Sequence, residues 1–245
     1  DGTLTGSPTG GDGGTNYFTV RVTDAAGQNA FALVTISVTT VTASGIWTAD
    51  TSANWSEPNR WSGNIVATGP AQTADFSTIN LSGNRTVTLD SSRSLGALKF
   101  GDTSGSQTWT VTNSNGGTLT LDNGLSTQPS INVTNNTANL AVPLGGGNGF
   151  VKNGPGTLIL SGNNLLTGVI NLDRGADGSA LNDGALRVTT SAALAGATQL
   201  AIRNTSVTTG GGRLELDGSA GDIVISQDLI TSMRNNTTRN LPNIA

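Results

Sequence analysis

GGGNGFVKNGPGTLILSGNNLLTGVINL, residues 145–172, is the stretch that decides the fold. It contains two short apolar runs, Gly156–Leu160 and Gly168–Leu172, separated by a turn of Gly and Asn. In the first run Leu158 and Leu160 fall on one face and the residues between them on the other, which is the period of a β-strand. Runs this short do not repay the cost of starting a helix. Because so small a unit cannot bury its apolar face alone, it requires copies of itself stacked on either side.

Degenerate copies of these runs recur along the chain. They are Arg85–Asp90, Leu95–Phe100, Gln107–Thr112, Thr118–Asp122, Ser130–Thr134, Ala138–Pro143, Gly149–Lys152, Gly184–Val188, Thr198–Arg203, Gly212–Asp217 and Asp222–Ser226. The gaps between them hold Gly, Asn, Asp, Ser or Thr and leave no room for a crossover helix. We therefore expect an all-β solenoid, with strands stacked about 4.8 Å apart around inward-facing Leu, Val and Ile. A β-sandwich is the alternative, since regular short strands also suit that fold.

The segment GNGFVKNGPGTLILSGNNLLTGVINLDRGA, followed by GALRV, resembles the autotransporter-associated β-strand repeat. The positions that carry the resemblance are Gly149, Lys152, Gly154, Gly156, Thr157, Leu158, Leu160, Ser161, Gly162, Asn164, Thr167, Gly168, Gly184 and Leu186. Ile170 and the longer loop DRGADGSALND before Gly184 depart from the pattern. The resemblance implies a right-handed parallel β-helix in a long secreted or surface protein of bacteria, with an architectural role and no catalysis.

Composition agrees with an all-β protein. Of 245 residues 34 are Gly, and only 11% are charged and 4% aromatic, so we expect little helix. There is no Cys, and therefore no disulfide framework. A net charge of −4 argues against nucleic acid as a partner. No apolar run is long enough to span a bilayer and no signal peptide opens the chain, which we expect to be part of a longer protein.

Residues 1–41 differ from the rest and are expected to form a β-hairpin around the turn DAAGQN. Their pattern resembles the C-terminal half of a bacterial immunoglobulin-like or cadherin-like domain. Two strands are not stable alone in water, so missing sequence, a partner or the solenoid must complete the unit. Asp12 and Asp24 are candidate ligands for calcium, because such domains place carboxylates at their ends. The favoured interpretation makes Asp24 a turn former and Asp12 a solvated acid, with no cofactor.

Residues 42–80 form a tryptophan-rich lead-in to the repeats, which we place at residues 81–245 and expect to continue beyond the C-terminus. Trp47, Trp55 and Trp61 lie close together in the sequence, and Trp109 follows in a predicted strand. Such a cluster is typical of a carbohydrate-binding platform, where ring faces stack on sugars. The favoured alternative is an aromatic plug over the end of the solenoid, with each indole N–H paired with a loop carbonyl. The pattern also resembles the lead-in of large surface proteins of this type.

Catalysis finds little support in the residue types. There is no His, which excludes Ser-His-Asp and Cys-His nucleophiles and histidine metal sites. A β-helix polysaccharide lyase or hydrolase would need Asp clusters and basic residues on strand faces. The candidates are Asp173, Asp177, Asp183, Asp217, Asp222 and Asp228, with Glu215 and a ladder of Arg187, Arg203 and Arg213. The alternative interpretation is a solvated face of screened charges.

Three functions therefore remain. The first is a non-catalytic structural or interaction module of a secreted or cell-surface solenoid: a stalk, an adhesin or an extracellular fibre subunit. Its partners would be other copies of itself, neighbouring domains of the parent protein or surface glycans, and open strand edges would favour a filament. The second is a carbohydrate-binding module built on the tryptophan cluster, and the third is the polysaccharide-degrading enzyme.

Overall fold

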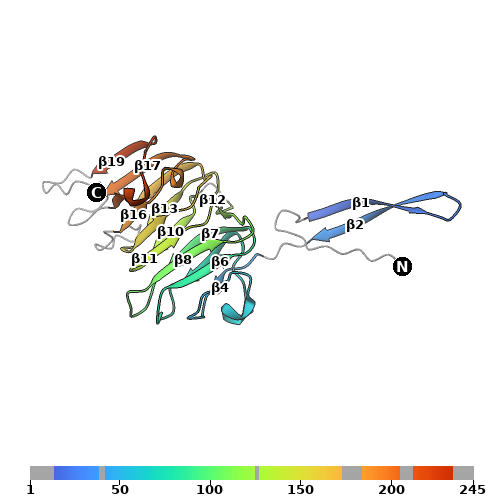
Figure 1. The fold of residues 1–245 in the computed structure, drawn as a ribbon, viewed down its shortest axis with the longest axis horizontal. Helices are drawn as coiled ribbons and strands as arrows, with labels where there is room; N and C mark the ends of the chain where they lie inside the picture. The colour runs from blue at the N-terminus through green and yellow to red at the C-terminus, as the bar shows by residue number, and fades with distance from the viewer. Residues whose placement is uncertain (1–13, 39–41, 125–126, 173–183, 205–211, 234–245) are drawn as a thin grey trace. The chain divides into compact units, whose positions relative to one another are not determined.

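The computed structural model describes residues 14–38, 42–124, 127–172, 184–204 and 212–233. The chain divides into two compact units, Asp1–Val41 and Thr42–Ala245. Both are built from β-strands (Figure 1). Within the described ranges there is no α-helix, and helical structure is limited to the 3₁₀ turns Pro58–Arg60, Ser62–Asn64, Ser191–Ala193 and Gly218–Ala220. The all-β prediction is confirmed.

The first unit is the predicted hairpin. Strands β1 (Gly14–Thr23) and β2 (Asn29–Val38) pair antiparallel, with Phe18 opposite Val34. The Asp24 carboxylate accepts hydrogen bonds from the backbone N–H groups of Ala26 and Gln28, as the turn-former interpretation expects. Asp12 lies outside the described residues.

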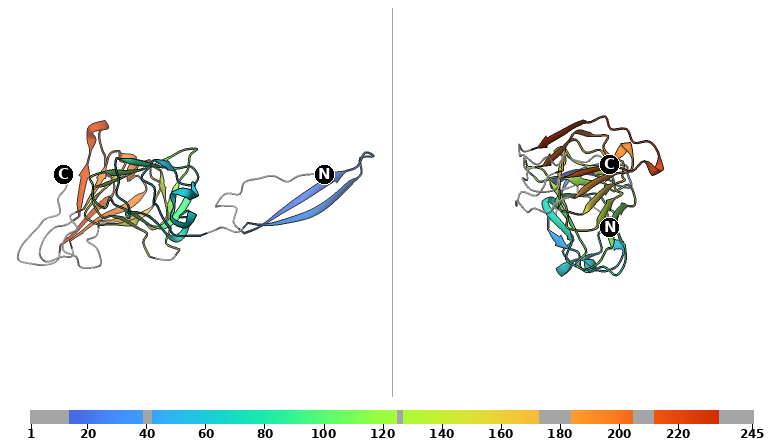
Figure 2. Two further views of the ribbon diagram at one scale, coloured as in Figure 1. Left: turned by 90° about the horizontal axis from the view of Figure 1, so that it is seen from below. Right: turned by 90° about the vertical axis from the view of Figure 1, so that its left-hand side faces the viewer.

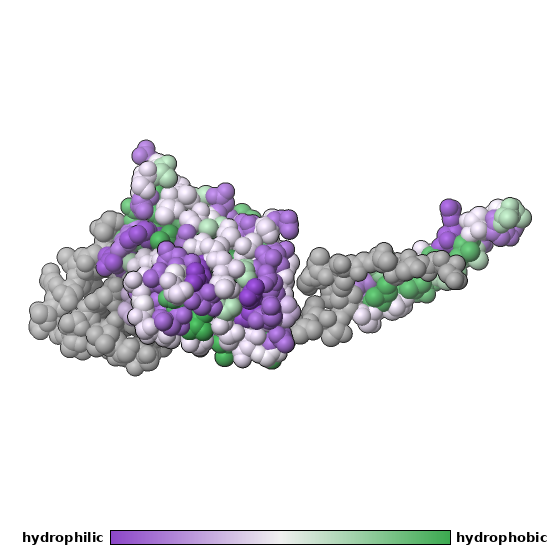
Figure 3. Space-filling view, turned by 60° about the horizontal axis from the view of Figure 1, so that its bottom comes forward, coloured by the Kyte–Doolittle hydropathy of each residue, from purple (hydrophilic) through white to green (hydrophobic). Residues whose placement is uncertain are grey.

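Large apolar side chains line both faces of this hairpin and are open to solvent. Those of Tyr17, Phe18, Val20, Val22, Phe31 and Leu33 are between 42% and 68% exposed. Figure 3 shows green, hydrophobic atoms along the hairpin. The described residues of the first unit thus form a single two-stranded sheet with both faces apolar, and such a sheet needs a further layer for stability in water.

The second unit contains seventeen strands within its described residues. They are β3 (Gly45–Ile46), β4 (Ala53–Asn54), β5 (Gly69–Phe76), β6 (Arg85–Leu89), β7 (Arg93–Phe100), β8 (Thr108–Asn113), β9 (Leu119–Leu121), β10 (Ser130–Val133), β11 (Thr137–Leu140), β12 (Leu144–Gly145), β13 (Phe150–Asn153), β14 (Thr157–Leu160), β15 (Gly168–Leu172), β16 (Ala185–Val188), β17 (Ala197–Asn204), β18 (Arg213–Leu216) and β19 (Asp228–Met233).

These strands form a ten-stranded and a seven-stranded sheet, and the chain passes repeatedly from one to the other (Figures 1 and 2). The seven-stranded sheet has the order β18-β16-β14-β11-β8-β6-β4. In the ten-stranded sheet, the long strand β7 pairs with β9 through its first half and with β10 through its second. Every ladder between these strands is parallel. This finding contradicts the antiparallel sandwich that was the alternative.

The register places apolar side chains of successive strands directly above one another. One inward-facing column runs Val87, Val111, Leu140, Leu160, Val188, with each residue paired to the next. All five side chains are fully buried. Residues from both sheets belong to a single hydrophobic core, so the two sheets share one interior. The predicted burial of alternating aliphatic residues is therefore confirmed.

One predicted strand is wrong. Asp222–Ser226 has no regular structure, and the last described strand, β19, begins at Asp228. The alternation that suggested a strand is real, since Ile223 and Ile225 both pack against the core. Burial of alternating side chains does not by itself create a ladder, because a strand also needs a partner for its backbone groups.

Candidate functional site

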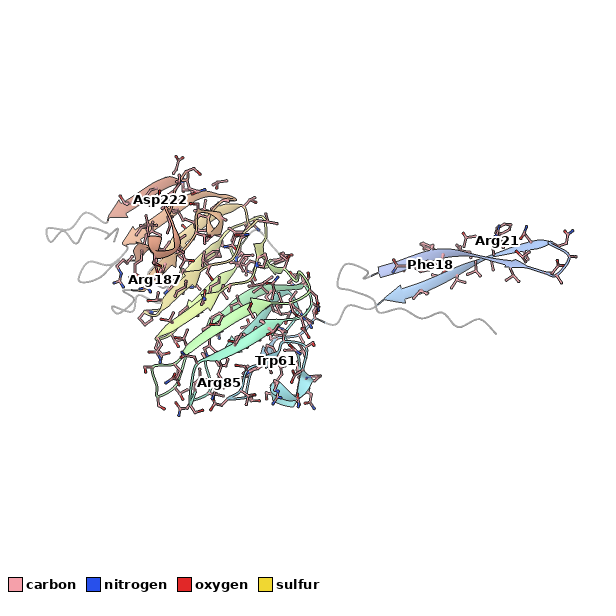
Figure 4. The ribbon with its side chains drawn as sticks, in the orientation of Figure 1. Phe18, Arg21, Trp61, Arg85, Arg187 and Asp222 are labelled. Atoms are coloured by element: carbon pink, nitrogen blue, oxygen red, sulfur yellow. The ribbon has the colours of Figure 1, made fainter. Side chains whose placement is uncertain are left out.

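The tryptophan cluster, defined as Trp47, Trp55 and Trp61, belongs to the segment that forms the N-terminal edge of both sheets. In that segment β3 pairs only with β5, and β4 only with β6. The relative exposure of the three side chains is 0%, 0% and 2%. Trp61 stands between two 3₁₀ turns, where Gly63 adopts a φ of 62° that a side chain would disfavour. Trp61 is labelled in Figure 4.

Each indole N–H of the tryptophan cluster donates to a backbone carbonyl. Trp47 donates to Ala49 at 2.7 Å, Trp55 to Ala67 at 3.0 Å and Trp61 to Trp55 at 2.8 Å. These bonds satisfy the polar atom that makes burial of an indole costly. The pairing is the one expected for an aromatic plug.

Phe76 links the cluster to the core beyond it. Its ring centroid lies 5.3–5.7 Å from the rings of the three tryptophans. It also stacks on Phe100, its register partner in β7, at 5.2 Å and an interplanar angle of 8°. Aromatic contacts at such distances stabilise a core beyond the area they bury.

The burial of Trp47, Trp55 and Trp61 therefore contradicts the prediction that they form a carbohydrate-binding surface. A sugar platform needs exposed ring faces, and these rings are turned into the core. The clustering signal was real, but it reflected packing at the end of the sheets.

The repeat motif provides the second candidate site, around Lys152. This side chain is 2% exposed and occupies an inward-facing position between Ile131 and Leu172 of neighbouring strands. Its Nζ donates hydrogen bonds to the carbonyls of Gly154 and Gly156, each at 2.5 Å. Burial lowers the pKa of the Lys152 amine to about 7. An alternation that places Lys beside Phe150 on the inner face was the sequence signal for this arrangement.

Glycine at two further motif positions lets neighbouring backbone close over Lys152. A Cβ atom on Gly184 would overlap both Lys152 Nζ and the Gly154 carbonyl oxygen. A Cβ on Gly156 would lie 2.5 Å from Val133 Cγ1. Any side chain at either position would force the layers apart.

Asn164 connects three successive passages of the chain. It is 2% exposed, its Oδ1 accepts from the backbone N–H of Leu144 at 2.9 Å, and its Nδ2 donates to the carbonyl of Ala193 at 2.8 Å. Asn135 makes a similar bridge, accepting from the N–H of Asp102 and donating to its carbonyl. The Asn residues thus hold backbone of one layer against the next, while Lys152 binds carbonyls of its own layer.

Asp102 is a buried carboxylate that no sequence pattern singled out. It is 1% exposed, and its two oxygens accept from the N–H groups of Leu81 at 3.0 Å and Gln107 at 3.2 Å. Burial alone would raise the pKa of Asp102, but these and neighbouring backbone donors outweigh it and lower the pKa below its usual value. Its hydrogen-bond partners are backbone groups in loops, so no pattern of side chains in the sequence predicts the buried Asp102.

We expect Asp102→Asn to lower the free energy of unfolding by about 1.5–3 kcal/mol, the value of a hydrogen bond to a charged group. The amide turns one acceptor into a donor that faces a backbone N–H. Since the pKa of Asp102 is lowered by folding, its contribution is present above the pKa of the unfolded chain and is lost as pH falls through the folded pKa. Urea unfolding at pH 7 and in the acid range checks both points, and equal losses at both would contradict them.

The sheet topology contradicts the predicted ladder of Arg187, Arg203 and Arg213. Arg187 in β16 and Arg213 in β18 lie in the seven-stranded sheet, whereas Arg203 belongs to β17 in the ten-stranded sheet. Glu215 joins the first two, at 2.8 Å from Arg187 and 2.6 Å from Arg213. Burial of Glu215 opposes its ionisation, but hydrogen bonds from both arginines lower its pKa overall.

The described candidate acids Glu215 and Asp217 are engaged in contacts other than with a second carboxylate. Asp173, Asp177 and Asp183 lie outside the described residues. The Asp217 side chain accepts from the N–H of Ser219 and caps a 3₁₀ turn. Glu215 pairs with two arginines. Asp222 precedes the last described strand, and Asp228 begins that strand, in the ten-stranded sheet. Arg187 and Asp222 are labelled in Figure 4.

Among the described residues, no group of three or more Asp, Glu, His or Cys is placed to hold a metal ion. No helix in that part of the chain is long and apolar enough to cross a membrane. Comparison of the chain with protein-family models, with curated proteins and with solved structures finds no match.

Proposed function

We propose that the chain is a structural module of a large bacterial protein that is secreted or held at the cell surface, where it serves as part of a stalk, adhesin or fibre. In this proposal the two parallel sheets are walls of a right-handed β-helix of the kind found in autotransporter-associated repeats. The main support for the proposal is that the motif residues make contacts with the backbone of the layers. Asn164 bonds to the backbone of the layers before and after its own. Lys152 binds two carbonyls of its own layer, and Gly184 of the next layer packs directly against it.

The chain returns repeatedly to the same sheet, which supports the helical winding. In the seven-stranded sheet Leu158 pairs with Leu186 and Leu186 with Leu214, a step of 28 residues each time. A stack in which each layer contacts only its neighbours has nearly one-dimensional energetics and resists extension layer by layer. This property suits a rigid spacer or fibre, and it needs no reactive group. No described contact favours the carbohydrate-binding or lyase functions over this one.

Force spectroscopy tests the layered architecture. The chain has no Cys, so Thr51→Cys and Ser219→Cys introduce two unique handles at exposed positions near the ends of the second unit. The register repeats between the handles range from 20 residues, Ala138 to Leu158, to 34 residues, Ala53 to Val87. At about 3.5 Å per extended residue, stepwise unfolding should release roughly 70–120 Å at a time. Release of the whole unit in one step would contradict independent layers.

Location is tested separately in the organism that makes the protein. Antibodies raised against the purified chain are expected to label intact cells or the medium, and protease treatment of intact cells should remove the label. Label found only after the cells are opened would overturn the proposed location, whatever the force measurement gives.

A further inference from the structure

Threonine side chains form a regular array on the outer face of the seven-stranded sheet. On β6, β8, β11 and β14 the inner positions are buried and the outer positions half-buried. The outer positions include Thr86 and Thr88, then Thr108, Thr110 and Thr112, and then Thr137 and Thr157. We call these seven residues the threonine array. It is a product of the fold, because the strands that carry it are separated by loops and by strands of the other sheet.

The register aligns the array across the strands. Thr86 pairs with Thr110 and Thr88 with Thr112, while Thr137 pairs with both Thr108 and Thr157. No register shift interrupts these three ladders. Neighbouring threonines are therefore about 4.8 Å apart across the strands and about 6.6 Å apart along them, which are the strand spacing and twice the rise per residue.

The chemistry of the array is uniform. Each member offers one hydroxyl and one methyl group, and none of the seven hydroxyls bonds to another protein group in the described part of the chain. The remaining outer positions on these strands are Asn139 and Ile159, so no outer position on them carries a charge. The aromatic ring on β8, Trp109, points into the core. The face therefore lacks both the charges that bind ionic polymers and the aromatic platform that binds sugars.

We propose that the threonine array binds the surface of ice. Faces of ice present rows of water oxygens with two repeats close to those of the array. Methyl groups restrict the orientation of water next to them, and the hydroxyls between them can donate to and accept from that ordered layer. A rigid parallel sheet holds these groups in place before contact, so little entropy is lost on binding. This activity goes beyond the structural role and does not depend on where the protein is located.

The size of the threonine array limits how strongly we expect the chain to bind ice. Asn139 and Ile159 interrupt the middle row, and the next strand carries Arg187, which pairs with Glu215. Only a patch on four strands is thus available. We expect adsorption to ice and inhibition of recrystallisation, with a small effect on the freezing point.

Partition into slowly growing ice tests the inference with the full chain. The wild-type chain should be enriched in the ice at least about tenfold over a protein that does not bind ice. Thr110→Lys, at the centre of the array, should abolish that enrichment, because an ammonium is strongly hydrated and protrudes from the face. Thr19→Lys is the matched control, since Thr19 is an exposed strand threonine of the other unit, and it should behave as wild type.

Circular dichroism and melting temperature show whether each variant is folded, and Thr112→Lys on the same strand replaces Thr110→Lys if that protein does not fold. Exclusion of the wild-type chain from ice would overturn the inference. So would full enrichment of a folded array variant, or an equal loss in Thr19→Lys. Binding to crystalline cellulose without enrichment in ice would show that the occupant is a glycan and would also refute it.

Discussion

Trp55→Ala is expected to lower the free energy of unfolding by about 3–5 kcal/mol, the range for removing a large buried aromatic side chain. The Trp55 ring is fully buried against Trp61 and Phe76, at 5.3 Å from each. Its truncation leaves a cavity at the edge of both sheets and leaves the Ala67 carbonyl without its indole donor. Urea unfolding of the wild-type and variant chains measures the difference.

Trp55→Phe separates the two parts of that loss. It keeps most of the ring and removes the N–H, so a smaller loss of about 1–2 kcal/mol is expected. Tyr17→Ala, in the hairpin, is the control for an exposed aromatic residue, because Tyr17 is 67% exposed. Its effect on the second unit should be negligible. If Trp55→Ala cost under about 1 kcal/mol and instead abolished binding to a glycan, the plug would be wrong and the platform right.

The stability of the second unit is expected to rise by up to about 4 kcal/mol between pH 6 and pH 10, because of Lys152. Burial lowers the pKa of its amine from 10.5 to about 7 in the folded chain. Between those values the unfolded chain binds more protons than the folded one, so stability increases with pH. Below pH 7 both states are protonated, and the destabilisation is complete. The Gly154 and Gly156 carbonyls oppose the shift by accepting from the ammonium, so 4 kcal/mol is an upper value.

Few other side chains in this sequence change their charge between pH 6 and pH 10, which makes the effect of Lys152 easier to identify. There is no His and no Cys, and Lys99 is the only other lysine. Lys152→Met should remove most of the rise between pH 6 and pH 10, because the thioether fills the same space without a titrating group. Lys99→Met should leave it unchanged, since the Lys99 side chain is 48% exposed and lies 3.8 Å from Asp75. A rise of the same size in both variants would show that another group is responsible.

Local pattern was sufficient to predict most strands of the second unit. In β14, Leu158 and Leu160 alternate with less buried neighbours, as expected from the sequence. The hairpin of β1 and β2 was likewise predicted from alternation and a turn. Such patterns work because the alternation of side chains along a strand is a property of the backbone itself. They fail where alternating side chains are buried but the backbone forms no ladder, as in Asp222–Ser226.

Prediction of the candidate sites was weaker, because composition does not state which way a side chain points. The tryptophans were correctly singled out, but both an exposed platform and a buried plug were compatible with their spacing. Arg187, Arg203 and Arg213 looked like one ladder because they occur on successive predicted strands. Their strands β16, β17 and β18 alternate between the two sheets, so Arg203 does not share a face with Arg187 and Arg213.

The sequence by itself determined that this chain is built from short, glycine-punctuated strands with an aliphatic inner face, since the strand period and the turn residues act over a few residues. Only the tertiary structure decided what contacts what. It turned the tryptophans inward, buried Lys152 under Gly184 and brought threonines of four strands into one array. These outcomes depend on the register between strands that lie 20 or more residues apart. That register is fixed by the packing of the whole core, and no local stretch encodes it.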